Sequence, residues 1–397
     1  MEYYVHEWAL MLLRWLHVIT VIAWIGASFY FVWLDNSLEK PSDPDLLQKG
    51  VDGELWAVHG GGFYNPQKYR VAPKALPTNL HWFYWESYST WLSGMALFVG
   101  LYLLNAKTYM IDPQIYAMSE STAILFTFAF LVAGLVVYEA ICRFFGRNVW
   151  LSAVALGIMV TLASFAACHV FQGRAAFLIV GAMLATLMTA NVFFWIIPGQ
   201  RKVIASMRAG EKVNPIYGQR GKQRSVHNTY FTLPVLFAML SNHYNMMYNH
   251  PMNWLVLVLM MTSGVLIRQF FLLKHKKKIN WYFPLSGVVN MLGVFFWIAP
   301  KSPQAQAQAQ DSAPPSTAEI QVVINSRCVG CHATHPTLMD APAPKGVILE
   351  TAKEIDKHAN MIFIQVVQLK VMPLANLTHI TDEERALIAK WYEGRKP

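Results

Sequence analysis

Residues 175–198 read AAFLIVGAMLATLMTANVFFWIIP, twenty-four residues without a charged side chain. A hydrocarbon core about 30 Å thick is crossed by about 20 apolar residues in a helix, so this stretch is long enough to span a membrane. Seven further runs meet or approach that length, and they lie near 9–34, 84–104, 121–141, 150–171, 229–247, 252–273 and 281–299. The sequence therefore predicts an all-α fold built on a bundle of eight transmembrane helices.

The composition also favours a membrane protein over a nucleic-acid-binding one. Of the 397 residues, 55% are hydrophobic and 14% are charged, and the formal net charge is +9. All of the excess positive charge lies before residue 311, in short segments between the apolar runs. A nucleic-acid-binding protein would gather its cations on one polar face, whereas this distribution is typical of loops that face an anionic membrane leaflet. We expect membrane lipid as a partner and no nucleic acid.

Lysine and arginine residues are concentrated in every second loop, and this pattern predicts an orientation in the membrane. Nineteen of them follow the first, third, fifth and seventh runs, and only Lys107, Arg174 and Lys301 lie in the other set. Because cytoplasmic loops carry the excess of basic residues, we expect a bacterial inner (plasma) membrane protein with both ends in the periplasm. The residues before the first run are not basic and show no cleavage pattern, so that run is expected to be a retained helix. A count of seven helices, with the run around Pro234 left out, would place the C-terminal part in the cytoplasm.

The chain changes character after residue 300. Residues 301–316 are rich in Pro, Ala and Gln and predict a flexible linker between a transmembrane domain (1–300) and a small soluble domain (317–397). That domain mixes charged and apolar residues at helical spacing, and Thr381 is expected to cap its last helix. About eighty residues is near the lower limit for a core without a covalent staple.

The sequence Cys328-Val329-Gly330-Cys331-His332 supplies such a staple. This spacing lets two thiols add across the two vinyl groups of a haem while the adjacent imidazole ligates the iron. A zinc site would need a second pair of ligands, and the domain has no other cysteine. A thiol–disulfide motif would leave the histidine unexplained. We predict one covalent haem c, attached outside the membrane, in agreement with the orientation derived from the charges.

The sixth ligand of the iron is expected to be a methionine, because a thioether suits iron that only transfers electrons. Met372 lies on a predicted loop before the last helix, so His332 and Met372 are the predicted metal ligands. Met339 follows His332 too closely to reach the far face of the haem, and Met361 is expected to pack in a core. Weaker alternatives are His335, His358 and His379. The sequence thus predicts that the C-terminal part is a class I-like cytochrome c domain that carries single electrons.

Three membrane segments carry a resemblance to a known family. RWLHVITVIAWIGASFYF (14–31), NVFFWIIPGQRKV (191–203) and RSVHNTYFTLPVLFAMLSNHY (224–244) resemble the bacterial integral-membrane, cytochrome c-linked urate oxidase family, also called urate hydroxylase. The likeness covers nearly the whole chain. It implies a step of purine catabolism, the two-electron oxidation of urate with water to 5-hydroxyisourate. The electrons would leave through the c haem, rather than to oxygen, to a soluble or membrane acceptor.

Ionisable side chains within apolar runs are costly and usually functional. The oxygens of a flat, anionic purine need a cation such as arginine, and its oxidation needs a base such as neutral His or Glu. The predicted catalytic residues are His17, His169, Arg174 and His243, toward the outer face, and Glu86, toward the cytoplasmic face. A second set toward the cytoplasmic face comprises His81, Glu139, Asn191 and His227. Each of these side chains can instead hold helices together or lie at the interface.

The distance to the predicted haem distinguishes a substrate site near the outer face from one near the cytoplasmic face. Electron tunnelling falls steeply with separation, and the bilayer is about 30 Å thick. A purine near the cytoplasmic face therefore cannot pass electrons directly to a haem outside. Either urate binds in the outer layer, or a possible second haem, of b type and held by membrane histidines, relays the electrons. Two further functions remain open: a quinol-linked cytochrome b/c oxidoreductase, and a transporter or anchor for a cytochrome c.

Overall fold

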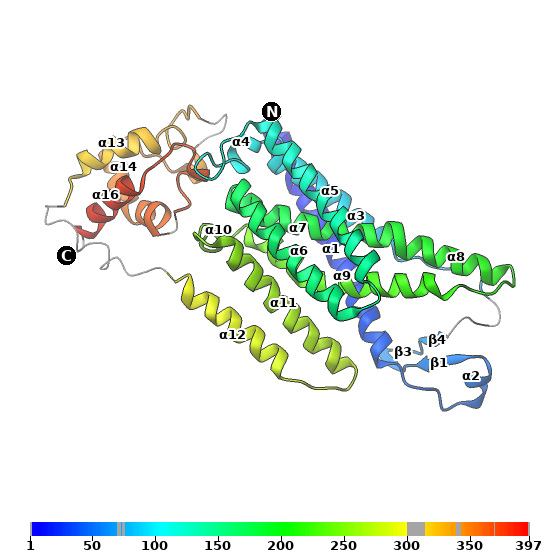
Figure 1. Cartoon of the computed structure of the whole chain (residues 1–397). Helices are drawn as coiled ribbons and strands as arrows, with labels where there is room; N and C mark the ends of the chain where they lie inside the picture. Colours follow the sequence, from blue (N-terminus) through cyan, green and yellow to red (C-terminus); the bar gives the residue numbers. More distant parts are fainter. Residues whose placement is uncertain are drawn as a thin grey trace.

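The structure is a computed structural model that describes residues 2–69, 73, 76–299, 314–338, 343–368 and 370–395. Most of the predicted linker lies outside the described residues, and so do Met339 and the basic residues Arg70, Lys74 and Lys301. The described chain is mostly helical and comprises a long bundle and a smaller helical unit formed by the C-terminal part (Figure 1).

Every one of the eight predicted apolar runs is helical. The segments are α1 (Glu2–Ser37), α3 (Trp85–Phe98) with η1 (Val99–Leu103), α5 (Glu120–Phe145), α6 (Val149–Val170), α7 (Gly173–Ala190) with η2 (Asn191–Ile196) and α8 (Ile197–Arg208), α9 (Pro215–Ser241), α11 (Asn253–His275) and α12 (Tyr282–Trp297). Within the described residues, five stretches are long and apolar enough to cross a membrane: Tyr4–Ser37, Glu120–Phe145, Val149–Val170, Gly173–Arg208 and Asn253–His275. The other runs are short or polar, since α12 has 16 residues and α9 begins with PIYGQRGKQR.

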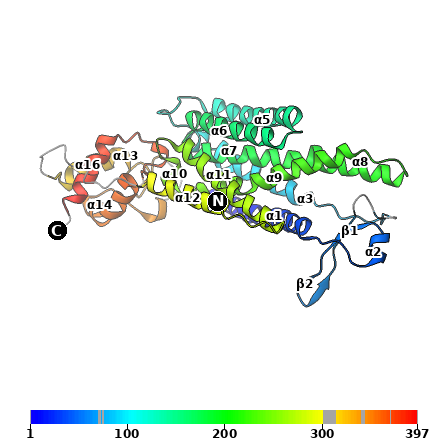
Figure 2. The same cartoon turned by 60° about the horizontal axis from the view of Figure 1, so that its bottom comes forward.

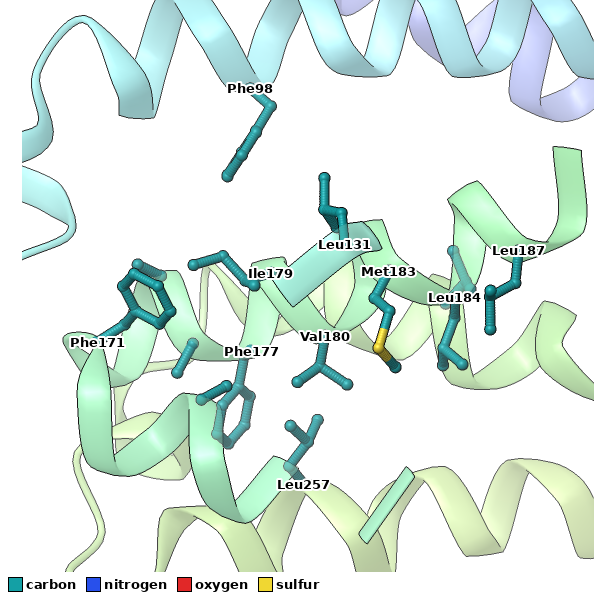
Figure 3. Close-up of a cluster of buried hydrophobic side chains, with 14 of the residues drawn as sticks. Phe98, Leu131, Phe171, Phe177, Ile179, Val180, Met183, Leu184, Leu187 and Leu257 are labelled. Carbon is teal, nitrogen blue, oxygen red and sulfur yellow. The ribbon is translucent and has the colours of Figure 1, made fainter. Parts of the chain in front are cut away.

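The core of the bundle forms around α7. Of its 18 residues, 12 are buried and none is exposed, as expected for a helix near the centre of a bundle. Figure 3 shows Phe177 of α7 among apolar side chains that include Leu131 of α5 and Leu257 of α11. Helix α9 lies very close to α7 at Gly181. A Cβ atom added at this glycine would be 2.7 Å from the Cβ of Ala238. A larger residue at position 181 would push the two helices apart.

A π-helical turn, η2, joins α7 to α8 within one continuous helix. Pro198 has no N–H, and its ring would clash with the carbonyl four residues earlier in a regular α-helix. The wider turn over Asn191–Ile196 accommodates this proline. Such turns occur frequently at functional sites, and this one places Asn191 in the interior, where it is 1% exposed.

The connection between α1 and α3 contains two small sheets, which the all-α prediction did not include. After α2 (Pro44–Gln48), β1 (Val51–Glu54) pairs with β4 (Gln67–Tyr69), and β2 (Ala57–His59) pairs with β3 (Gly62–Tyr64), both antiparallel. Gly60 and Gly61 connect β2 to β3 with φ angles of +59° and +79°, which suit a two-residue hairpin turn. Strands of three or four residues are too short to be recognised from an alternating pattern.

The C-terminal part, which we call the tail, has its own apolar core. It contains α13 (Thr317–Arg327), η5 (Pro344–Gly346), α14 (Ala352–Lys357), α15 (Ala359–Ile362), η6 (Phe363–Gln368), η7 (Leu374–Asn376) and α16 (Asp382–Glu393). Ile320, Ile388 and Trp391 are among its buried side chains. Thr381 caps α16 and forms a capping box with Glu384, which confirms the predicted start of the last helix. The tail lies at the end of the bundle that holds α4 (Ala106–Tyr109) and α10 (Asn245–Tyr248) (Figures 1 and 2).

Candidate functional site

The two cysteines of the tail motif lie in a tight turn directly after α13. The amides of Cys331 and His332 both donate to the carbonyl of Cys328, at 3.1 and 2.9 Å. Both cysteines are free. Burial raises the pKa of the Cys328 thiol to about 12, and burial also raises that of Cys331. Both groups are therefore thiols at neutral pH.

His332 and Met372, the predicted ligands of the iron, each contact other residues of the tail. The Nδ1 atom of His332 lies 2.9 Å from the carbonyl oxygen of Val347, which leaves Nε2 available for a metal. Met372 packs against the same apolar cluster as Cys328 and Val347. The donor set therefore fits a thioether-bound haem. Met361, expected in a core, is 51% exposed. Among the described residues, no group of three or more His, Cys, Asp or Glu side chains is arranged to hold a metal ion.

An ion pair lies deep in the membrane bundle. Arg224 on α9 donates two hydrogen bonds to the carboxylate of Glu139 on α5, each 2.8 Å long, and a third of 3.3 Å to Asn191. Its guanidinium lies 5.0 Å from the ring centre of Tyr138 and 4.8 Å from that of Trp195. Arg224 is only 4% exposed. A charge in such surroundings is costly unless it is paired, and Glu139 provides the pair.

Further polar side chains extend this pair into a network. The amide nitrogen of Asn191 donates to the hydroxyl of Tyr138 and to the side-chain oxygen of Asn228, both at 2.8 Å. The Tyr138 hydroxyl lies 2.9 Å from Nδ1 of His227. We call this set the buried network: Tyr138, Glu139, Asn191, Arg224, His227 and Asn228. It joins α5, η2 and α9 and contains three members of the second set predicted from the sequence.

Two arginines that the orientation argument counted as loop residues lie inside the bundle. Arg224 belongs to the buried network, and Arg268 on α11 is 3% exposed. The guanidinium of Arg268 lies 3.9 Å from the ring centre of Phe29 on α1. Helix α9 begins at Pro215, well before its predicted apolar run, and this extension brings Arg224 into the interior, whereas Arg268 already lies within the predicted run 252–273. The remaining basic residues still favour the same loops.

A cavity of about 340 Å³ lies beside the buried network. Helix α1, the segment before α3, the helix containing η2, and α9 form its wall, and Asn228 belongs to both the wall and the network. Its aromatic lining is formed by Trp24, Phe31, Trp82 and Phe83, and its polar lining by Ser28, His81, Gln200, Ser225, Asn228 and Thr232. In the part of the chain that the structure describes, the side chains of Ser28, His81, Gln200 and Ser225 make no hydrogen bond. They are therefore available to a ligand.

The five predicted catalytic residues do not form one site. Across residues 2–69 and 76–299, no hydrogen bond or ion pair joins any two of them. The Nδ1 atom of His17 lies 3.0 Å from the Ser93 hydroxyl, between α1 and α3. His169 bonds the carbonyl of Phe165 in its own helix at 2.8 Å, and His243 is exposed. One carboxylate oxygen of Glu86 is buried without a partner.

Arg174 is the member of that group with the most polar surroundings. Its Nε donates to the side-chain oxygen of Asn242, which also accepts a 2.7 Å hydrogen bond from Tyr102. Its guanidinium lies 5.6 Å from the ring centre of Tyr109. We call Arg174, Asn242, Tyr102 and Tyr109 the tail-side cluster. Seventeen residues of continuous helix separate Arg174 from Asn191, about 25 Å. The tail-side cluster and the buried network therefore lie at opposite ends of the bundle.

The sequence reasoning did not single out most of the cavity. Asn228 and Gln200 were not considered, and His81 was placed near the cytoplasmic face as an alternative. A signal was present at 80–86, LHWFYWE, where a histidine lies among four aromatic rings directly before a helix. A second signal was the spacing of Arg224 and Asn228, four residues apart and so on one face of a helix. Neither signal reveals a cavity, which depends on how four segments meet.

One comparison with known proteins gives a match. The family model described as urate oxidase N-terminal matches residues 3–299, three quarters of the chain. The match covers the bundle, including the buried network, the cavity and the tail-side cluster, and it ends before the tail. No curated protein and no solved structure matches the chain.

Proposed function

The chain belongs to the urate oxidase N-terminal family, and we propose that it is a membrane-bound enzyme that oxidises urate. Urate and water would give 5-hydroxyisourate, two protons and two electrons, and the electrons would pass to a c-type haem in the tail rather than to oxygen. Family membership supports an oxidoreductase related to urate. Five helices that can cross a membrane support the membrane location, for which we propose the bacterial inner membrane with the tail outside.

The cavity is the observation that carries the assignment of the substrate. Urate is flat, anionic and rich in oxygen and N–H groups. Trp24 and Trp82 offer aromatic faces for stacking, and Ser225 and Gln200 offer uncommitted hydrogen-bonding groups. Arg201 lies 5.8 Å from the ring centre of Trp82 and adds a positive charge near the cavity. A wall that combines aromatic faces with free polar groups suits a purine better than a lipid chain.

We assign proton transfer to His81 and substrate orientation to Asn228. His81 lines the cavity, packs on the ring of Phe83 at 4.5 Å between centres, and leaves its ring nitrogens free for a substrate proton. The amide of Asn228 uses one N–H on the carbonyl of Met188 and keeps the second for the cavity. Its oxygen is held by Asn191, so the buried network fixes the amide in one orientation.

The tail is proposed to hold the electron acceptor. A haem c would be held by Cys328, Cys331, His332 and Met372. When bound, it would accept the electrons that leave the substrate one at a time. The cavity lies far from the tail, so a relay is needed. His17 lies seven residues before Trp24 on the same face of α1, closer to the tail, with Nε2 free. We propose that a second, b-type haem held by membrane histidines relays the electrons.

Anaerobic titration of the purified full-length protein with urate tests the proposed function. The absorption bands of the c haem should shift to the reduced form, with one urate reducing two haems, because each haem accepts one electron. An unchanged haem spectrum would show that the proposed oxidation is wrong. Extraction of the non-covalent haem with acidified solvent then tests the relay, since a b-type haem leaves the protein and a c-type haem does not.

A pair of asparagine variants ties the oxidation to the cavity. Asn228→Leu should slow haem reduction by urate strongly. Asn290→Leu is the matched control, because Asn290 on α12 also bonds a helix carbonyl, that of Leu259, at 2.7 Å and lies outside this cavity. Equal rates in the two variants would exclude the cavity as the site of oxidation.

A further inference from the structure

The loop around Met372 contacts the membrane bundle at two points. The side-chain amide of Asn249, directly after α10, donates to the backbone carbonyl of Lys370 at 3.3 Å. Four residues later, η7 packs against α4. Met372 lies between these two points in the chain. The predicted iron ligand is thus on the side of the tail that faces the bundle.

Interactions within the tail hold this loop in shape. Arg385 on α16 is 7% exposed and donates to the carbonyls of Met372, at 2.9 Å, and of Val366. Lys370 pairs with Asp382 at 2.9 Å and has a φ angle of +49°. The carbonyl that Asn249 contacts therefore belongs to a fixed loop.

The bundle side of the contact is also well anchored. In α4, Ala106 is fully buried, and so is Met110, which follows the helix. The ring centres of Tyr109 and Tyr102 are 5.8 Å apart. The guanidinium of Arg174 lies 5.6 Å from the ring centre of Tyr109. The surface that meets η7 is thus continuous with the tail-side cluster.

We propose that the tail works docked on this end of the bundle, with loop 370–376 seated on α4 and α10, and that it receives electrons through its Met372 side. The source of the electrons rests on the proposed function. The contact is small, as in weak electron-transfer encounters. A tether of the length predicted for residues 301–316 keeps the tail near its docking surface, so a weak contact is sufficient. The remaining faces of the tail are left for the downstream acceptor.

A matched pair of leucines tests the docking surface. Leu374 of η7 is 39% exposed, and Leu387 of α16 is 37% exposed and lies two residues, about 200° of helical rotation, from Arg385, which contacts the loop. Leu374→Glu places a charge against α4 and should slow haem reduction by urate about tenfold, while Leu387→Glu should leave it nearly unchanged. A small soluble reductant such as ascorbate should reduce the haem equally fast in both variants. Equal rates with urate would overturn the proposal.

Photocrosslinking gives a readout that does not depend on urate. A benzoylphenylalanine at position 249 of the full-length protein should attach to peptides covering 370–376, and one at position 279, a surface residue at the other end of the bundle, should not. Attachment to another face of the tail, or no attachment, would overturn the docking. If urate fails to reduce the wild-type haem while the crosslink forms, the proposed function is wrong and the docking stands.

Discussion

The two ends of the bundle each hold an arginine in a different setting. Arg224 is buried, paired with Glu139 and surrounded by hydrogen-bonded side chains beside a cavity. Arg174 is half-buried, bonds the neutral side chain of Asn242, and lies next to the surface that contacts the tail. A deeply buried charge needs an organised partner set, which is also what an active site needs. In the proposed function, the first end carries the substrate chemistry and the second end delivers electrons to the tail.

The largest expected difference between the ends concerns stability. Glu139→Gln leaves the Arg224 cation unpaired in the interior and should lower the free energy of unfolding by about 3–5 kcal/mol. Arg174→Gln removes one hydrogen bond at a half-buried site and should cost about 1 kcal/mol. Thermal unfolding of both proteins in the same detergent measures this. Similar losses would mean that the buried network has no special energetic role. The double variant Glu139→Leu/Arg224→Leu should be more stable than Glu139→Gln.

The second largest difference between the two ends should be in the rate of haem reduction by urate. His81→Ala should lower the rate of haem reduction by saturating urate about 10²–10⁴-fold, because it removes the proposed proton acceptor. His243→Ala should have little effect, since this side chain is exposed at the other end. Single-turnover mixing under anaerobic conditions gives both rates. The reverse order would place the chemistry at the tail side, where His17, His169, Arg174 and His243 were predicted to act.

Substrate affinity should show a smaller effect. Trp24→Leu removes one aromatic face of the cavity and should raise the KM for urate about tenfold, the value of a stacking contact of about 1.4 kcal/mol. Trp297→Leu is a control, because Trp297 on α12 is 40% exposed and packs on His250 outside this cavity. Steady-state rates with an artificial electron acceptor give the two KM values. A KM raised equally by both changes would point to a general disturbance of the bundle.

The smallest expected effect concerns the stability of the tail. Burial alone would raise the pKa of Glu384, but hydrogen bonds from Arg327 and from the Thr381 backbone outweigh it and lower the pKa below its ordinary 4.5. This carboxylate therefore stabilises the folded tail fully above about pH 4.5, and the stabilisation is lost as the pH falls through the lowered value. Glu384→Gln should cost about 1 kcal/mol at pH 7 and weaken the acid sensitivity of tail unfolding. Unfolding followed by haem absorption at pH 7 and pH 3 measures both; an undiminished acid sensitivity would contradict the assignment.

The sequence predicted the parts of the fold that follow from local patterns. Each apolar run is helical, and the cap at Thr381 is where the sequence placed it. The helix of run six, however, begins at Pro215, because polar residues such as Arg224 join it once a partner neutralises them. The cavity and the docking of the tail were not predicted, since they depend on contacts between segments far apart in the chain. Haem attachment at Cys328 and Cys331 stays a prediction.

The π-helical turn before Pro198 contains one more residue than a regular helical turn would. Deleting a single residue there would restore ordinary winding and rotate everything that follows by about 100° relative to α7. Gln200 would then leave the cavity wall, while Asn191 and Met188 would stay in place. The shape of the binding site thus depends on an insertion that leaves no trace in hydrophobicity, and a homologue that lacks this residue should accept a different substrate.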